Sequence, residues 1–221
     1  MQAKPDRAHG FSSNREYYLR ALRRHAHELI NMGYGRLVPS ELSGSAETHI
    51  TGELVQAIHA AMQAPDAPSW VVHYALPKDD PPLNTPGRHG SSRVRVDIEF
   101  ERVKCGPRPL LRFEAKRLGN GHPVSMYLGD EGLGCFLSGK YPTTHGEGGM
   151  LGYIQTESEE HWAAKISAAL KEGRRKHTVC KDGQWCSTNI IHGLKHTYRT
   201  QHHAPRPGDS LLIHHILLRF C

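Results

Sequence analysis

The clearest pattern in the chain is a strict alternation of polar and apolar residues over 93–101. A period of two predicts a half-buried β-strand. The alternation stops at Gly106-Pro107 and resumes over 110–116. Two alternating runs separated by a short break predict an antiparallel hairpin.

The position of the break also predicts the register of this hairpin. A turn centred between Cys105 and Gly106 sets Asp97 opposite Glu114, with Cβ atoms about 4.5–5.5 Å apart. Lys116 shares a face with Glu114 because strand side chains alternate. The hairpin therefore predicts two carboxylates and one ammonium on one polar patch.

Apolar residues at helical spacing predict three longer helices, over 13–33, 51–64 and 156–173. The first and third begin with a Ser/Thr-x-x-Glu capping box, and both end at a glycine. The first helix carries a basic face opposite its apolar stripe, made of Arg20, Arg23, Arg24 and His27. A short helix interrupted by glycines is predicted over 127–137.

Short strands are predicted at 70–74, 150–154, 194–202 and 211–220. Two segments show no periodic pattern: 77–92 is proline-rich, and 146–149 is predicted to be a glycine-rich turn. This mixture predicts an α/β (α+β mixed) fold with a central mixed β-sheet flanked by helices. We expect an N-terminal arm and basic helix over 1–48 and the main domain over 49–221. In a chain of this length we expect the two to pack as one compact domain.

The composition of the chain narrows the classes of protein to which it could belong. The chain has 221 residues, 17 histidines and a formal net charge of +6. A basic balance suits a polyanionic partner. A mean hydropathy of −0.56 and the lack of a long apolar run argue against a membrane span. Five cysteines without regular spacing and no visible secretory signal predict reduced thiols and a cytoplasmic location.

The acidic pair on the hairpin needs compensation, because like charges opposed on a sheet are destabilising. A divalent cation supplies it, and Mg²⁺ takes oxygen ligands from one or two carboxylates. Such an ion polarises a phosphodiester and lowers the pKa of a water that attacks phosphorus. The neighbouring ammonium can stabilise charge in the transition state.

The residues Val96-Asp97 and Glu114-Ala115-Lys116 resemble the D…ExK signature of the PD-(D/E)XK nuclease superfamily, with Val96 in place of the motif's proline. The resemblance covers about residues 51–154 and implies a restriction-endonuclease-like core. It implies that Asp97, Glu114 and the Ala115 carbonyl bind Mg²⁺, for which Mn²⁺ may substitute. It also implies catalytic roles for Lys116 and for a glutamate on the preceding helix, for which Glu53 is the candidate.

By this resemblance the chain is a metal-dependent endodeoxyribonuclease, which would suit the effector of a prokaryotic antiviral defence or restriction system. Its partners would be DNA and either a second copy of the chain or another subunit of a defence complex. Candidate contacts to DNA phosphates are Arg20, Arg23, Arg24, Arg117, Lys140, Arg174 and Arg175. Solvated helix faces are the alternative explanation of these charges.

Three other interpretations stay open. The hairpin could carry ordinary cross-strand ion pairs among Arg95, Glu99 and Arg112. The chain could be a non-catalytic nucleic-acid-binding or assembly subunit on the same fold. Cys180 and Cys186 could bind zinc, although their spacing exceeds that of the usual zinc knuckle. The paired histidines, His202-His203 and His214-His215, are expected to be partly exposed, with the two members of each pair on opposite faces of a strand.

Overall fold

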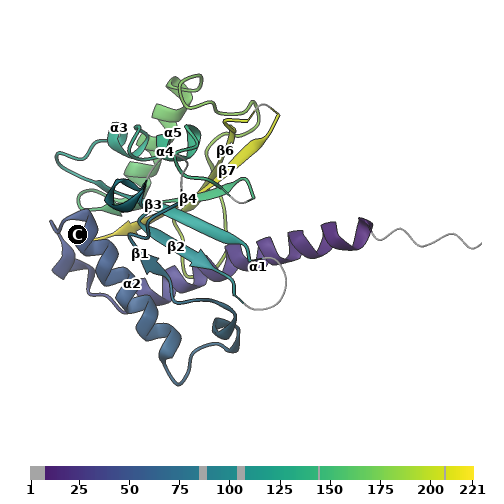
Figure 1. The fold of residues 1–221 in the computed structure, drawn as a ribbon. Coiled ribbons are helices and arrows are strands. Elements are labelled where there is room, and N and C mark those ends of the chain that lie inside the picture. Colours follow the sequence, from purple (N-terminus) through teal and green to yellow (C-terminus); the bar gives the residue numbers. More distant parts are fainter. Residues whose placement is uncertain (1–7, 85–88, 104–107, 144, 207) are drawn as a thin grey trace, which may run out of the picture.

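A seven-stranded mixed sheet with the order β1-β2-β3-β4-β7-β6-β5 runs through the molecule (Figure 1). The computed structural model describes residues 8–84, 89–103, 108–143, 145–206 and 208–221, with only the backbone described for 8–15. The strands are β1 (Lys78–Asp79), β2 (Ile98–Glu101), β3 (Leu110–Leu118), β4 (Glu147–Ile154), β5 (Cys186–Ser187), β6 (Thr197–His203) and β7 (Ser210–Arg219). The α-helices are α1 (Ala8–Tyr34), α2 (Glu47–Gln63), α3 (Val124–Tyr127), α4 (Gly134–Leu137) and α5 (Glu159–Glu172). The predicted class, a mixed sheet flanked by helices, is confirmed.

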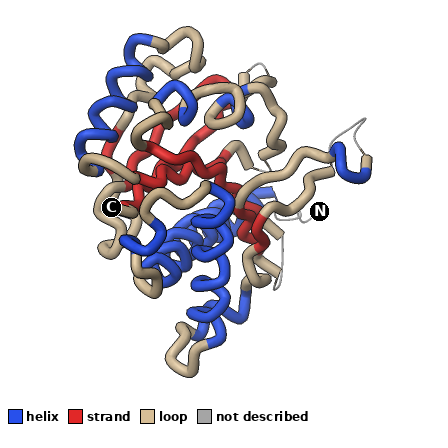
Figure 2. The backbone as a smooth tube through the Cα atoms, turned by 90° about the vertical axis from the view of Figure 1, so that its left-hand side faces the viewer, coloured by secondary structure: helices blue, strands red, loops and turns tan. Residues whose placement is uncertain are grey.

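Helices cover both faces of the sheet and create two cores (Figures 1 and 2). Helices α1 and α2 lie on one face, where Leu29 and Leu54 pack in one cluster with Phe113 of β3. Helices α3, α4 and α5 lie on the other face, where Phe136 and Ile166 pack in a second cluster. The boundary predicted at residue 48 falls inside α2, and α1 shares its core with the sheet.

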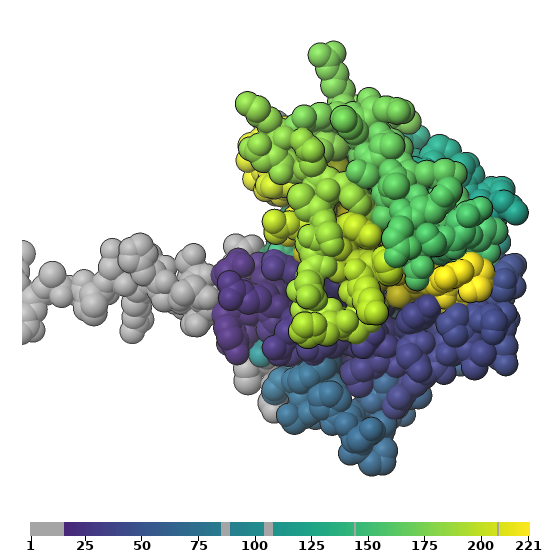
Figure 3. Space-filling model, turned by 180° about the vertical axis from the view of Figure 1, so that it is seen from behind, coloured from purple at the N-terminus to yellow at the C-terminus, as the bar shows by residue number. Residues whose placement is uncertain are grey.

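The segment after α5 ties the two layers together at the back of the molecule (Figure 3). It descends from α5 to α1, where Leu194 is buried in the α1/α2 core. Gly193 lies so close to Asn31 of α1 that a Cβ there would meet the Asn31 amide nitrogen at 2.3 Å. The two strands predicted at 194–202 and 211–220 are β6 and β7, and they pair antiparallel.

The central hairpin is confirmed, with the predicted register. Strands β2 and β3 are antiparallel, and Ile98 pairs with Phe113; one step further in this register, Asp97 lies opposite Glu114. The predicted turn centre at Cys105 and Gly106 lies outside the described residues. On its other side β3 pairs in parallel with β4.

The first strand of the hairpin is shorter than predicted. Its ladder with β3 includes only residues 98–101, whereas 93–97 run beside a proline-containing segment. There the Leu83 N–H donates to the Val94 carbonyl and the Val96 N–H donates to the Pro81 carbonyl. The segment 77–92, predicted to have no regular structure, also contributes the short strand β1. Prolines allow only a partial ladder, since each lacks an N–H.

Two predicted helix starts and one predicted strand were wrong in the N-terminal half of the chain. Helix α1 begins at Ala8, so Ser13 lies inside the helix rather than at its start. Helix α2 begins at Glu47, four residues before Thr51. The predicted strand 70–74 is a 3-10 helix (Ser69–His73), because Trp70 stacks on His25 of α1 with ring centroids 4.1 Å apart. That tertiary contact overrides the local β-propensity of the segment.

The later helices agree better with their sequence patterns. Helix α5 ends at Gly173 as predicted. Its predicted start at Thr156 was wrong, because Ser158 is the N-cap: the Ser158 side chain accepts from the His161 N–H, and the helix begins at Glu159. The region predicted as one interrupted helix forms α3 and α4. Apart from the segments left undescribed, no helix is long and apolar enough to cross a membrane.

The glycine-rich segment 146–149 is not simply a turn, because its last three residues belong to β4. Two of them permit close packing: a Cβ on Gly148 would lie 2.5 Å from Phe136, and one on Gly149 would lie 2.1 Å from Phe113. Two aromatic rings, one on each side of the sheet, therefore rest directly on the β4 backbone.

We predict that Gly149→Ala destabilises the protein by about 1–3 kcal/mol, the usual cost of overpacking a core. The matched control is Gly52→Ala on α2, where a Cβ meets nothing within 4 Å. It should stabilise the protein by up to about 1 kcal/mol because alanine is the better helix former. Urea unfolding of both variants measures the difference, and an unchanged midpoint for Gly149→Ala would contradict the packing argument.

Candidate functional site

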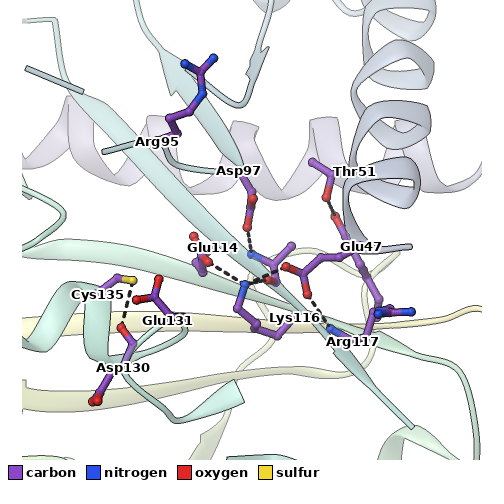
Figure 4. Close-up of polar contacts among 12 residues, drawn as sticks. Glu47, Thr51, Arg95, Asp97, Glu114, Lys116, Arg117, Asp130, Glu131 and Cys135 are labelled. Carbon is purple, nitrogen blue, oxygen red and sulfur yellow. Dashed lines mark hydrogen bonds and ion pairs between the residues drawn. The ribbon is translucent and has the colours of Figure 1, made fainter. Parts of the chain in front are cut away.

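The candidate site lies where β3 continues past the end of its ladder with β2 (Figure 4). On the N-terminal side of Ile98 the chain leaves the ladder. The Ala115 N–H of β3 therefore has no β2 backbone partner on that side. The Asp97 side chain takes this place: its Oδ2 accepts from the Ala115 N–H at 2.6 Å. The end of the ladder thus orients one carboxylate toward the middle of β3.

Lys116 is at the centre of the cluster (Figure 4). Its ammonium Nζ donates three hydrogen bonds, to Glu47 Oε1 at 2.7 Å, to Glu114 Oε1 at 2.8 Å and to the Ala115 carbonyl at 2.7 Å. The Lys116 side chain is only 13% exposed. All three donors of the ammonium are therefore satisfied by the protein.

Glu47, in the first turn of α2, is a site residue that sequence analysis missed. Its Oε1 accepts from Lys116, and its Oε2 accepts from the Arg117 N–H at 3.1 Å. One turn later, the Thr51 hydroxyl is 3.0 Å from the Tyr153 hydroxyl of β4, which holds this end of α2 against the sheet. Ile50 lies four residues before Leu54, at helical spacing, and acidic residues favour a first helical turn. Both signals could have moved the predicted helix start back to Glu47.

Tyr141 was also missed, and it supports Glu114 from the α4 side of the sheet. Its hydroxyl is 2.7 Å from Glu114 Oε2 and 2.7 Å from the Arg95 carbonyl. No local motif indicates this contact, because 27 residues separate Tyr141 from Glu114. Together with Lys116, this hydroxyl leaves both Glu114 oxygens hydrogen-bonded.

Burial and mutual repulsion raise the proton affinity of the acids. Burial, followed by the charge of Asp97, raises the pKa of Glu114 to about 8. Burial also raises the pKa of Asp97, against the Ala115 hydrogen bond that lowers it. Burial alone would lower the pKa of Lys116, but Glu114 and Glu47 together raise it above its usual value. The ammonium therefore stays charged and partly compensates the carboxylates.

Glu53, the predicted catalytic glutamate, is not brought to this cluster. It follows Thr51 by two residues, which is about 200° around an α-helix, so it lies on a different face of α2 from Glu47 and Thr51. Among the described residues the Glu53 side chain has no hydrogen bond or ion pair. The structure places Glu47 where the sequence analysis had placed Glu53.

The hairpin also carries ion pairs of the kind that the alternative interpretation expected. Arg112 Nε donates to Glu99 Oε2 at 2.8 Å, with both side chains nearly buried. Arg95 pairs instead with Asp80, at 2.6 Å. These pairs flank the cluster of Asp97 and Glu114 and do not include either acid.

The basic residues predicted to contact phosphates fall into two groups. The side chains of Arg20 and Arg175 are exposed, and they have no hydrogen bond or ion pair among the described residues. The others have partners within the protein: Arg23 with Glu147, Arg24 with Glu28 and His25, Arg117 with Ser45, Lys140 with Glu131, and Arg174 with the carbonyls of Val179 and Cys180. Only the first group is free to meet a ligand without breaking a contact.

The predicted basic face of α1 is partly internal. Arg23 donates to both oxygens of Glu147, at 3.1 and 2.5 Å, and Glu147 also contacts His214 Nε2 at 3.1 Å. Although burial opposes it, these partners lower the pKa of Glu147 to about 2. His27, expected on the polar face, is fully buried and packs edge-on against Phe113. The packing of α1 against the sheet therefore buries part of the face that was predicted to be polar.

The strand histidines are mostly structural, and the prediction that they are partly exposed was wrong for His202, His214 and His215, all buried. The expected opposite orientation is confirmed, since His214 contacts Glu147 on the α1 side and His215 contacts Tyr127 of α3. A hydroxyl of Thr200 links His215 and His202 at 2.8 and 2.7 Å. Burial lowers the pKa of His202 to about 4, so this buried network is neutral at pH 7.

The candidate site offers a small set of metal donors, all of them oxygens. Within the described part of the chain, no group of three or more His, Cys, Asp or Glu side chains could hold a metal ion. Cys186 is exposed on β5, and Cys180 is half-buried. Asp97, Glu114 and the Ala115 carbonyl form a smaller set of oxygen donors. This set fits Mg²⁺, which is commonly bound through one or two carboxylates with waters completing the shell.

Comparison of the chain with protein-family models, with curated proteins and with solved structures finds no match.

We predict that Glu114→Gln changes how stability depends on pH. The folded-state pKa of Glu114 (about 8) lies above its ordinary value of 4.5, so the folded protein binds this proton more tightly than the unfolded chain. The resulting stability is fully present below pH 4.5 and is lost as the pH rises through 8. In EDTA, Glu114→Gln should lose less stability than the wild type across this window.

Urea unfolding at a series of pH values measures this effect, with Glu53→Gln as the matched control outside the cluster. Equal pH slopes for the wild type and Glu114→Gln would show that Glu114 does not titrate in this range.

Proposed function

We propose that this protein is a Mg²⁺-dependent nuclease that hydrolyses DNA phosphodiester bonds. The observation that carries the proposal is the convergence of Asp97, Glu114 and Lys116 around the Ala115 carbonyl, at the end of the β2–β3 ladder. This is the set of groups that the D…ExK resemblance implies. The net charge of +6 is consistent with a polyanionic substrate.

Each residue has a role in this proposal that follows from its contacts. The Ala115 N–H fixes one oxygen of Asp97, so the other oxygen can bind the ion. Tyr141 orients Glu114, whose Oε1 faces the Lys116 ammonium. A bound Mg²⁺ would polarise the scissile phosphate and lower the pKa of an attacking water.

Lys116 would supply the positive charge that the reaction needs beside the ion. Its ammonium has a raised pKa and so serves as a charged hydrogen-bond donor rather than as a general base. A preorganised donor of this kind stabilises negative charge as it develops on the phosphate oxygens. Glu47 holds the ammonium close to the site.

We further propose that the enzyme works in the cytoplasm as an effector of a prokaryotic antiviral defence or restriction system, as a homodimer or with a partner subunit. Two active sites are the simplest way to cut both strands of a duplex. The support is the D…ExK resemblance.

We predict that the purified protein cleaves supercoiled plasmid with Mg²⁺ or Mn²⁺ and not with EDTA. Glu114→Gln and Lys116→Met should each lower the rate by about 100-fold or more, the usual effect of removing a transition-state contact. Glu47→Gln should also impair cleavage, whereas the matched variant Glu53→Gln on the same helix should not. Cleavage in EDTA, or full activity of Glu114→Gln, would overturn the proposal.

A second candidate function is a non-catalytic nucleic-acid-binding or assembly subunit on the same fold. The observation in its favour is that Lys116 itself bridges Glu47 and Glu114, so the fold can compensate these acids without a metal. This candidate predicts DNA binding in EDTA that survives Asp97→Ala, together with no cleavage under any metal condition.

For either function we predict that Arg20→Gln and Arg175→Gln weaken DNA binding without changing stability, since both side chains are exposed. Each should reduce the slope of log affinity against log salt by about 0.9, the value for one phosphate contact. Arg23→Gln is the matched variant on α1: it should lower stability by about 1–3 kcal/mol, because Glu147 loses a buried charged partner. Fluorescence anisotropy across a salt series measures the slopes, and unchanged slopes would remove these arginines from the interface.

A further inference from the structure

The Lys116 ammonium occupies the same acceptors that the proposed metal ion would use. Two of its three hydrogen bonds go to Glu114 Oε1 and to the Ala115 carbonyl, at 2.8 and 2.7 Å. Both groups are proposed ligands of Mg²⁺. The third bond goes to Glu47, which lies on another element and is not among those ligands.

We propose that Lys116 is an internal competitor for the metal, so that the ion binds only when the ammonium leaves Glu114 and the Ala115 carbonyl. This inference rests on the proposed function. An ammonium that kept both of these acceptors would share two ligand oxygens with the divalent ion. Two cations held that close repel each other. The site therefore has two arrangements, one closed by Lys116 and one open to the metal.

Glu47 gives the displaced ammonium a place to stay. Its Oε1 already accepts from Lys116, and its Oε2 is fixed by the Arg117 N–H at 3.1 Å. When the bonds to Glu114 and the Ala115 carbonyl break, the bond to Glu47 can persist. Lys116 then stays at the edge of the site with two donors released, and these can meet a substrate phosphate.

The same contacts explain why the competition is selective. A buried acidic pair would otherwise attract any cation, since uncompensated buried charges are costly. Lys116 compensates the negative charge of the cluster until it is displaced by an ion that binds more strongly than an ammonium. A divalent ion that brings its own waters and a substrate phosphate meets that condition better than a monovalent one.

The test is Mn²⁺ affinity measured by isothermal titration calorimetry on the full chain. Lys116→Met removes the competitor, and we expect it to bind Mn²⁺ about tenfold more tightly than the wild type, the effect of losing one charge-assisted contact. Lys140→Met is the matched control: it removes an equal charge nearby, but its ammonium bonds to Glu131 and not to a proposed ligand. Its affinity should stay within about twofold of the wild type.

A crystal structure of the wild type with Mn²⁺ supplies a readout that does not depend on how well Lys116→Met folds. We expect Lys116 Nζ to have left the Ala115 carbonyl and to have kept Glu47. Competition is overturned if the wild type binds Mn²⁺ while Nζ keeps all three acceptors, or if Lys116→Met binds no more tightly. If neither protein binds Mn²⁺, the metal-dependent function itself fails, and the competition fails with it.

Discussion

The arrangement of the site depends on one interaction, the three-way hydrogen bonding of the buried Lys116 ammonium. It joins Glu114 and Ala115 of β3 to Glu47 of α2, so a single cation connects the sheet to a helix that packs on one of its faces. Because Asp97 and Glu114 are buried, the negative charge of one raises the free-energy cost of ionising the other. The ammonium offsets that cost. The packing of α2 and the chemistry of the site are thus coupled.

The rest of the fold serves to bring these groups together. The β2–β3 ladder includes Ile98 but not Asp97. Because Asp97 lies just outside the ladder, its carboxylate can reach the β3 backbone. Glycines in β4 let aromatic rings pack directly on the sheet on both sides. Tyr141 reaches Glu114 from the opposite layer. Contacts from both helical layers therefore converge on one short stretch of β3.

The proposed nuclease and the proposed competition describe the same site in two states. With Lys116 bonded to Glu114, the cluster is satisfied by the protein itself. With a metal in its place, the ammonium becomes available to substrate. The histidine network and the Arg23–Glu147 pair lie elsewhere and hold the sheet to α1 and α3. The buried histidines of these groups thus serve the construction of the core and not the chemistry of the site.

The sequence by itself determined the central hairpin, its register and the meeting of Asp97, Glu114 and Lys116, because strand alternation and a short turn are local constraints. Only the tertiary structure decided which glutamate joins them. Glu47 and Glu53 lie on the same helix, and the start of α2 and the face it turns to β4 depend on packing against distant strands. Contacts such as Tyr141 with Glu114 span separate layers, so no sequence period can encode them.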